Sequence, residues 1–348
     1  MGMLRNNFSR GFEADEPKTS LGRPGTGKAG FFKLKKIRTK EKFISSNTLK
    51  VIVILGQTAT GKSNLAVKIA LRLGSTTLTT SRSGFSSKKM EAEIISADSR
   101  QVYKGLDIGT GKITQKEMRG VPHYLLDVVN PKNKFTVAEY KKLAEKKIKE
   151  ILTRGKVPII TGGAGFYLDA VTKGIMLPEV PPNKKLRKDL EQKTAETLFN
   201  ILKKLDRDRA ENIDSKNKVR LIRAIEITKA LGKVPKITKA TPPYKFIKIG
   251  LYLPPDKLKK KIEKRVKKMF QDGLLNEIKK LKRTGVSNKR LSEFGFEYFN
   301  PTYEKVVQKT LNYAKRQMTW FKRDKEIKWF NASSKNLFWR AMRESNPR

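Results

Sequence analysis

The sequence predicts an α/β fold, in which a parallel sheet of the P-loop NTPase type is flanked by helices and carries an all-helical insertion. Three observations support this prediction. A short aliphatic stretch runs into a glycine-rich loop at residues 50–63, strand-like and helix-like segments alternate after it, and strand signals disappear at residues 181–247. The 348 residues are 37% hydrophobic, which is enough to form a sizeable core.

The composition excludes several classes of protein. With no cysteine and a single histidine, His123, the chain can form neither a disulfide framework, nor a thiolate nucleophile, nor a cysteine-type zinc site. The 78 Lys and Arg residues outnumber 33 Asp and Glu, and the formal charge of +45 favours binding to nucleic acid over a merely solvated basic surface. No stretch approaches the roughly 20 apolar residues of a membrane helix, so we expect a cytoplasmic protein with no membrane contact.

The first half of the chain is expected to form a flexible arm and the first part of the core. Residues 1–48 mix basic residues with Gly, Ser, Thr and Asn without a regular period, which predicts a flexible basic arm. Residues 49–180 show the periodicities of alternating strands and helices. We expect a strand at 50–55, a helix at 64–73, a polar surface loop at 74–90, a strand at 92–97, a helix at 136–153 and a strand at 157–161.

The second half is expected to leave the sheet and return to it. Residues 181–247 form the predicted helical insertion, with helical patterns at 186–205 and 218–231. Residues 248–332 are the second part of the core, and residues 333–348 show no pattern and predict an unstructured tail. Within the second core part we expect a strand at 248–253, one long basic helix at 256–282 and a last helix at 303–321.

A phosphate-binding loop is the strongest local signal. Residues 56–63 fit the pattern G-x-x-x-x-G-K-[ST] and stand between a predicted strand and a predicted helix, as that pattern requires. Backbone amides and the helix N-terminus would hold phosphate oxygens, Lys62 would add charge, and Ser63 could bind Mg²⁺. A second match at residues 22–29 is interpreted as a coincidence, because no strand precedes it and Ala29 has no hydroxyl group.

The ends of the other strands should lie beside this loop, because ligands of doubly wound sheets bind outside the carboxyl ends of the strands. Asp98 and the pair Gly162 and Gly163 follow predicted strands. Asp98 fits three roles equally well: a general base, a residue that acts on Mg²⁺ through water, or a helix N-cap. Asp107 is a turn residue or part of a loop over phosphates, and for His123 we favour packing or hydrogen bonding over catalysis.

Seven motifs in order make the chain resemble the tRNA dimethylallyltransferase family, also called tRNA isopentenyltransferases, over roughly residues 50–330. They are GQTATGKS (56–63), IISADSRQVYKGLDIGTGK (94–112), PHYLLDVVNP (122–131), TGGAGFYLDA (161–170), VRLIRAIEI (219–227), KRVKKMFQDGLLNEI (264–278) and YAKRQMTWFKRD (313–324). The resemblance implies transfer of a dimethylallyl group from its diphosphate to N6 of the adenosine at position 37, beside the anticodon of tRNA, with release of diphosphate.

The resemblance also implies a role for individual residues. Asp98 would be the general base, Lys62 and Arg265 would bind the diphosphate, and Ser63 would bind the cofactor Mg²⁺. The loop that holds the diphosphate would consist of Gly56, Gln57, Thr58, Ala59, Thr60, Gly61, Lys62 and Ser63. The tRNA contacts would be Asp98, Ser99, Arg100, Gln101, Ala164, Arg187, Arg220, Arg223, Phe294, Gly295 and Phe296. The partners would be the anticodon arm of tRNA and dimethylallyl diphosphate, with the helical insertion binding tRNA and the enzyme a monomer.

Two positions depart from the family pattern. Ala164 stands where relatives usually carry threonine, and Phe296 where tyrosine is common, so a hydroxyl group is missing near the reacting amine and at a tRNA contact. These departures leave open a catalytically decayed tRNA-binding protein. Two enzyme classes also stay open: a P-loop nucleoside or metabolite kinase, which would carry an arginine-rich lid, and an adenylate isopentenyltransferase, which would not need the basic C-terminal helices.

Overall fold

A six-stranded parallel sheet forms the centre of the protein. The computed structural model describes residues 49–344 except 76, 79–87, 90 and 237, so the predicted arm and the glycine pattern at 22–29 lie outside the described residues. The strand order is β5-β4-β6-β1-β7-β8, and every pairing in this sheet is parallel. The strands are β1 (Lys50–Gly56), β4 (Ala92–Ala97), β5 (His123–Tyr124), β6 (Val157–Gly162), β7 (Lys245–Tyr252) and β8 (Lys328–Asn331).

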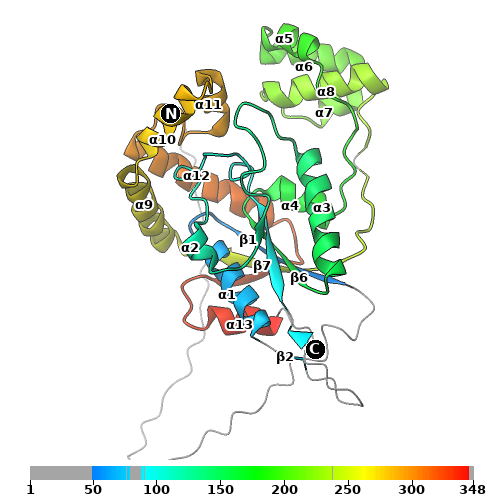
Figure 1. The fold of residues 1–348 in the computed structure, drawn as a ribbon. Helices are drawn as coiled ribbons and strands as arrows, with labels where there is room; N and C mark the ends of the chain where they lie inside the picture. Colours follow the sequence, from blue (N-terminus) through cyan, green and yellow to red (C-terminus); the bar gives the residue numbers. More distant parts are fainter. Residues whose placement is uncertain (1–48, 76, 79–87, 90, 237, 345–348) are drawn as a thin grey trace, which may run out of the picture. The chain divides into compact units, whose positions relative to one another are not determined.

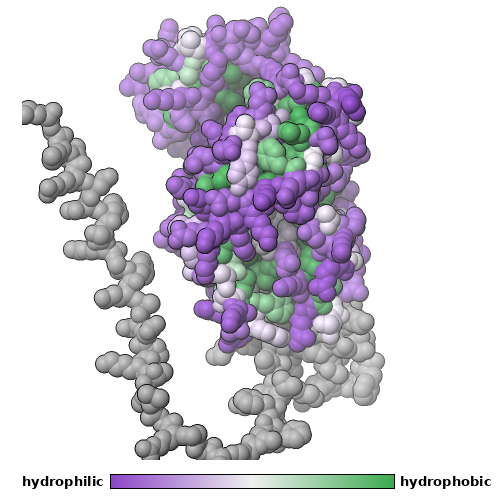
Figure 2. Space-filling view, turned by 90° about the vertical axis from the view of Figure 1, so that its left-hand side faces the viewer, coloured by the Kyte–Doolittle hydropathy of each residue, from purple (hydrophilic) through white to green (hydrophobic). Residues whose placement is uncertain are grey.

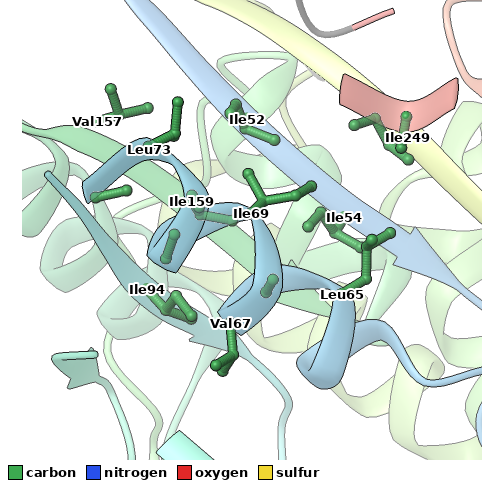
Figure 3. Packing of buried hydrophobic residues seen from close by; sticks show 14 of the residues in the cluster. Ile52, Ile54, Leu65, Val67, Ile69, Leu73, Ile94, Val157, Ile159 and Ile249 are labelled. Atoms are coloured by element: carbon green, nitrogen blue, oxygen red, sulfur yellow. The ribbon is translucent and has the colours of Figure 1, made fainter. Parts of the chain in front are cut away.

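Helices cover both faces of this sheet. On one face, α1 (Lys62–Gly74) packs against Ile52, Ile54 and their neighbours, as Figure 3 shows. On the other face, α3 (Val137–Thr153), α4 (Gly165–Thr172) and α12 (Tyr303–Phe321) cover Val51 and Val53. Alternate side chains of a strand point to opposite faces, so one continuous aliphatic strand supplies both layers of the core. This arrangement confirms the predicted α/β fold.

The predicted insertion is helical and has an apolar centre of its own. It contains α5 (Lys184–Glu191), α6 (Ala195–Leu205), α7 (Arg207–Glu211) and α8 (Lys218–Leu231), which lie together in Figure 1. Leu198, Leu202, Leu221 and Ile225 are fully buried between these helices. Each of the four helices begins at an Asn, Thr or Asp whose side chain accepts a backbone hydrogen bond, so polar side chains fix where they start.

The basic segment after β7 differs from the prediction of one long helix. It consists of α9 (Pro255–Gln271) and α10 (Leu274–Arg283), followed by α11 (Asn288–Phe294). The break lies at Gly273, whose φ of +99° is in the left-handed region that glycine adopts at little cost. Figure 2 shows the side of the protein that carries these helices, where hydrophilic residues predominate and apolar patches lie between them.

The prediction of an unstructured tail at residues 333–348 was wrong in its centre. Helix α13 (Leu337–Glu344) packs Phe338, Ala341 and Met342 against the apolar face shared with α1. Its apolar residues recur at helical spacing, but eight residues are too few for a convincing sequence signal.

Elsewhere, the predicted surface loop contains a short hairpin, β2 (Thr77–Leu78) and β3 (Lys88–Lys89), and α2 (Gln115–Met118) precedes β5. Among the described residues, no helix is long and apolar enough to cross a membrane.

Candidate active site

The P-loop joins β1 to α1, in the strand–loop–helix order that the sequence predicted. A Cβ atom at Gly56 would lie 2.1 Å from the carbonyl oxygen of Leu251 in the neighbouring strand β7, so only glycine fits there. Gly61 has a φ of +87° and is the N-cap of α1. Inside the loop, Lys62 Nζ donates a hydrogen bond of 2.7 Å to the carbonyl oxygen of Gln57. The loop therefore closes on itself and presents the first turn of α1 to the cavity above it.

Two cationic side chains line this cavity without a carboxylate partner within ion-pair distance in the described part of the chain. Burial and the positive charge of Arg265 lower the pKa of Lys62 to about 7, although the negative charge of Asp98 opposes the shift. Arg265, on α9, donates a hydrogen bond of 2.8 Å from Nη2 to the carbonyl oxygen of Thr110. A Cβ atom at Gly111 would lie 2.5 Å from the same nitrogen. The two side chains thus hold unneutralised positive charge where an anionic ligand could bind.

Asp98 directly follows β4 and lies at the edge of the sheet where the sequence placed it. Its Oδ1 accepts hydrogen bonds from the backbone amides of Arg100, at 2.8 Å, and Gln101, at 3.3 Å. These bonds fix the carboxylate as a cap of the turn that follows, which was one of its three predicted roles. They use only one carboxylate oxygen, and Asp98 also lines the cavity. Capping and general-base catalysis are therefore compatible.

Gln317, on α12, connects the P-loop to the end of β6. Its Nε2 donates a hydrogen bond of 2.9 Å to the carbonyl oxygen of Gly163, and its Oε1 accepts one of 2.8 Å from the backbone amide of Thr58. A Cβ atom at Gly163 would lie 2.2 Å from Nε2, which explains the glycine there. Sequence reasoning missed this residue as part of the site, because its partners lie far away along the chain.

Two adjoining cavities meet at this edge of the sheet. The first lies over the P-loop and the second lies beside residues 294–298. The residues that line both cavities are Thr58, Asp98, Thr110, Arg265 and Tyr313. A ligand phosphate over the P-loop and a group entering from the second cavity would therefore approach each other at Asp98 and Arg265.

Glu297 is a second carboxylate, which directly follows the predicted tRNA contacts 294–296 and for which no chemical role was predicted. It lines the second cavity together with Arg100 and Phe296. Burial raises its pKa to about 7, although the positive charges of Arg100 and Arg265 oppose the shift. No local pattern could have indicated this, because the shift depends on side chains from three separate segments.

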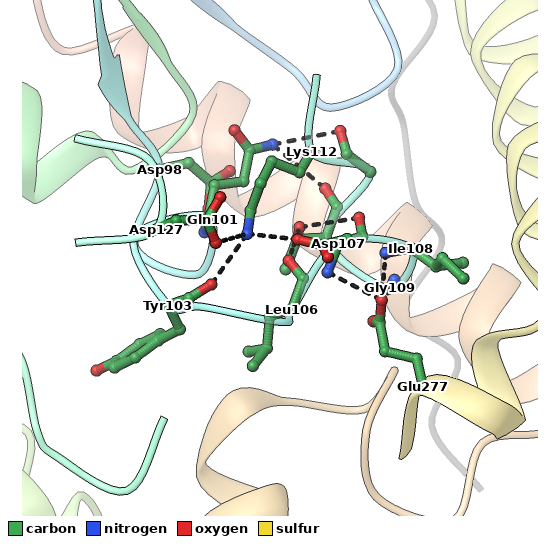
Figure 4. A network of polar contacts seen from close by, with 12 residues as sticks. Asp98, Gln101, Tyr103, Leu106, Asp107, Ile108, Gly109, Lys112, Asp127 and Glu277 are labelled. Carbon is green, nitrogen blue, oxygen red and sulfur yellow. Dashed lines mark hydrogen bonds and ion pairs between the residues drawn. The ribbon is translucent and has the colours of Figure 1, made fainter. Parts of the chain in front are cut away.

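The loop that contains Asp107 is held by protein groups. Glu277, on α10, accepts hydrogen bonds from the backbone amides of Asp107, Ile108 and Gly109 at 3.0, 2.7 and 3.1 Å, as Figure 4 shows. The Asp107 carboxylate instead pairs with Lys112 at 2.6 Å. This supports the interpretation of Asp107 as a turn residue, since three amides that could have contacted phosphate are occupied.

Two of the arginines predicted to contact tRNA make ion pairs inside the insertion. Glu226 on α8 is 2% exposed, and it accepts bonds from Arg187 Nε and Nη2 at 2.8 and 2.6 Å and from Arg223 Nη1 at 2.5 Å. Although burial by itself raises the pKa of Glu226, the hydrogen bonds from both arginines outweigh it and hold this pKa at about 2. Arg220 is exposed and has no ion-pair partner among the described residues.

The other predicted tRNA contacts differ in their access to solvent. The Phe294 side chain is 1% exposed and its ring centroid lies 5.0 Å from that of Tyr103, so most of the ring packs in the core, and Phe294 also lines the second cavity. Phe296 is partly buried at the second cavity. Ala164 is the N-cap of α4 and provides no side-chain cap, so the missing hydroxyl group also affects a helix start.

Comparisons with known proteins give one consistent result. Residues 101–324 match the family model described as IPP transferase. The chain is 36% identical to a tRNA dimethylallyltransferase of Anoxybacillus flavithermus over 310 residues, which cover 85% of this chain and 94% of the relative. The chain belongs to the tRNA dimethylallyltransferase family. A Bacillus subtilis relative with the same name is also 36% identical, over 81% of this chain and 90% of its own.

Solved structures of family members have the same fold. The full-length tRNA isopentenylpyrophosphate transferase of Bacillus halodurans is 33% identical and superposes with a TM-score of 0.59, covering 85% of this chain and 94% of its own. A eukaryotic dimethylallyltransferase acting on tRNA is 26% identical, with a TM-score of 0.70 and coverage of 84% and 77%. Membership in this family supports tRNA prenylation over a kinase activity.

The residues of this site fit a metal ion only if most ligands of that ion are not protein carboxylates. In the described part of the chain, no group of three or more His, Cys, Asp or Glu side chains could hold a metal ion. Ser63 lines the first cavity beside the phosphate-binding loop, and so does Asp98. Mg²⁺ retains several waters and prefers substrate phosphates, so this set of groups fits a hydrated Mg²⁺ ion beside a diphosphate.

Proposed function

We propose that this protein transfers a dimethylallyl group from dimethylallyl diphosphate to N6 of the adenosine at position 37 of tRNA, beside the anticodon, and releases diphosphate. The observation that carries the proposal is that Asp98 and Arg265 line both adjoining cavities, one of which lies over a phosphate-binding loop. The diphosphate of the substrate and the adenine of tRNA can therefore reach Asp98 and Arg265 from different sides.

In the proposed reaction, the N6 lone pair attacks the allylic carbon while the bond from that carbon to the diphosphate oxygen breaks. The electron pair of the broken bond leaves with diphosphate, where Lys62, Arg265 and the amides of the P-loop stabilise the added negative charge. The proton lost by N6 passes to Asp98, whose Oδ1 is already oriented by two backbone amides. Mg²⁺, when bound at Ser63, would further stabilise charge on the diphosphate.

The acceptor must leave its base stack before it can react, because an amine inside a stacked loop is out of reach. We propose that the adenosine enters the second cavity, past Arg100, Phe296 and Glu297. The basic surface of α9 and α10, together with exposed Arg220 on the insertion, would bind the phosphates of the anticodon arm. We further propose that the enzyme acts as a monomer in the cytoplasm.

The proposal is tested with radiolabelled dimethylallyl diphosphate and four acceptors: unmodified tRNA, the same tRNA with guanosine at position 37, free AMP, and nucleosides supplied with ATP. We expect Mg²⁺-dependent labelling of the unmodified tRNA alone, and an affinity for tRNA that falls steeply with salt. Labelling of AMP, or phosphoryl transfer from ATP without tRNA, would contradict it. Tight tRNA binding without any labelling would instead indicate a decayed, purely binding protein.

A further inference from the structure

Gly295 leaves room for the carboxylate of Glu297 in the wall of the second cavity. Both residues line this cavity, and the φ of Gly295, +124°, lies in the left-handed region that favours glycine. A Cβ atom at Gly295 would lie only 3.0 Å from Glu297 Oε2, so the glycine leaves this space to the carboxylate. The Glu297 side chain is partly exposed, and a group that enters the cavity can therefore reach it.

The charged groups around this carboxylate come from three other parts of the fold. Asp98 and Arg100 follow β4, Arg265 lies on α9 and Tyr313 lies on α12, and all four line the second cavity. Glu297 interacts electrostatically with each of them, but it forms no ion pair within the described part of the chain. A carboxylate that lies among the groups of one cavity and is paired with none of them is available to a ligand in that cavity.

Two carboxylates in this cavity match the amine that the proposed reaction uses. Asp98 and Glu297 both line the second cavity. The N6 amine of adenine has two N–H bonds in the plane of the ring, and its lone pair is perpendicular to that plane. One N–H bond breaks during transfer, and the other is retained in the product. Because Asp98 is the proposed acceptor of the proton that is lost, the retained N–H group needs a separate acceptor.

We propose that Glu297 accepts a hydrogen bond from the N–H group of N6 that is retained in the product, and that it thereby selects adenosine at position 37. This inference rests on the proposed function, which supplies the adenosine and the role of Asp98. An ionised carboxylate is only an acceptor, so it attracts the amine of adenine and repels the carbonyl oxygen that guanine carries at the same place. Two carboxylates that hold both N–H groups in the ring plane also leave the lone pair free to attack the allylic carbon.

The first test compares the affinities of the full chain for two tRNAs, one with adenosine at position 37 and one with purine riboside, which lacks the amine. Their ratio isolates the amine, because all other tRNA contacts are the same. Glu297→Met removes the acceptor and should reduce this ratio about 10- to 100-fold, the range for hydrogen bonds to charged groups. Glu297→Gln keeps an acceptor and should retain most of the preference. Glu304→Gln removes an exposed carboxylate that lines neither cavity, and it should leave the ratio unchanged.

The second test follows the same ratio with pH. Burial raises the pKa of Glu297 to about 7, although its own backbone amide and the charges of Arg100 and Arg265 oppose the shift. Tyr298 and Tyr313 have raised pKa values and stay neutral in this range. Because the ionised carboxylate is the better acceptor, the preference for adenosine should be constant above about pH 7 and fall below it by at most about tenfold per pH unit. Glu297→Gln should remove this dependence.

The outcomes separate this inference from the proposed function. Equal losses of affinity for both tRNAs in Glu297→Met would show that Glu297 only supports the cavity wall, and a preference that rises as pH falls would show that a neutral acid donates to the ring. Either result overturns the role of Glu297, while labelling of tRNA by wild type keeps the transferase proposal. If wild type labels no tRNA with dimethylallyl diphosphate, the proposed function fails and this inference fails with it.

Discussion

The P-loop site and the helical insertion differ in the partners of their cationic side chains. At the P-loop site, Lys62 and Arg265 line a cavity and bond to backbone carbonyl oxygens, with no ion pair to a described residue. In the insertion, Arg187 and Arg223 converge on one buried carboxylate, Glu226. Burial lowers the pKa of Lys62 to about 7, whereas the arginines hold the pKa of Glu226 at about 2.

The difference separates two roles that look alike in the sequence. A buried cation whose charge is already neutralised holds the scaffold together, and removing its partner leaves a charge that is costly to bury. A partly buried cation without a carboxylate partner is energetically unfavourable in the free protein and becomes favourable when an anion binds. A binding site for a diphosphate requires this property. We therefore expect Arg187 and Arg223 mainly to stabilise the insertion, whereas the exposed Arg220 is available for contact with tRNA.

The largest effect is expected at Asp98, whose carboxylate interacts electrostatically with both Lys62 and Arg265. Asp98→Asn should lower the single-turnover rate of transfer by about 10² to 10⁴, the usual range for a positioned general base, with diphosphate affinity nearly unchanged. Quenched-flow kinetics and calorimetry measure the two quantities. A variant that loses Mg²⁺ or diphosphate affinity and keeps its rate would make Asp98 a binding residue, and the core would then also neutralise its charges internally.

The insertion should respond to loss of its carboxylate by losing stability. Glu226→Gln should destabilise the fold by about 3 kcal/mol, at the lower end of the range for broken buried pairs, because both arginines are partly exposed. Because the folded pKa of Glu226 is depressed, this stabilisation is present above its ordinary pKa and is lost as pH falls toward about 2.

Chemical denaturation at several pH values measures this effect. Arg220→Ala is the matched control: stability should not change, while the salt dependence of tRNA binding should lose about one unit of slope. Equal effects of both changes on tRNA binding alone would remove the distinction drawn above.

The charge of Lys62 should make diphosphate binding depend on pH. Its pKa of about 7 in the free site rises when an anion binds, so binding takes up a proton. Affinity should be constant below about pH 7 and fall by at most about tenfold per pH unit above it. Calorimetry in buffers of different ionisation enthalpy measures the number of protons taken up on binding. The Lys62→Met variant measures the protons exchanged by the ligand alone, and this number is subtracted. No proton uptake by wild type would mean that Lys62 is already fully protonated in the free site.

The smallest effect concerns Ala164, the uncapped start of α4. Ala164→Thr should stabilise the protein by about 0.5–2 kcal/mol as a helix cap. If the hydroxyl group also bonds near the reacting amine, single-turnover transfer should speed up by about 2- to 13-fold, which corresponds to about 0.5–1.5 kcal/mol. Thermal denaturation and rate measurements on the same variant separate the two roles. An inactive natural chain that becomes active through this one change would contradict the transferase proposal.

The sequence predicted the features that depend on a few neighbouring residues. The P-loop, the strands at its sides and the helices of the insertion follow from local glycines, aliphatic runs and helical periodicity. The break at Gly273 was missed because apolar residues continue on both sides of it at helical spacing. The short edge strands β5 and β8 were missed because two to four residues carry little signal.

The site was predicted only where a motif pointed to it. Asp98, Lys62 and Arg265 line one cavity, as the family resemblance implied. Gln317 was missed, and no chemical role was predicted for Glu297, because the environments of both side chains are assembled from distant segments. The burial of Phe294 could not be predicted for the same reason, because it depends on tertiary packing against Tyr103.

Glu277 gives the site a property beyond its chemistry. By holding the amides of residues 107–109 and the hydroxyl group of Tyr298, at 2.8 Å, it connects α10 to the loop whose Thr110 carbonyl binds Arg265. These amides can exchange their hydrogens with solvent only when the carboxylate releases them. The walls of both cavities should therefore open together with α10 in a single event. The amides of the site should show the same protection against hydrogen exchange, as members of one cooperative unit.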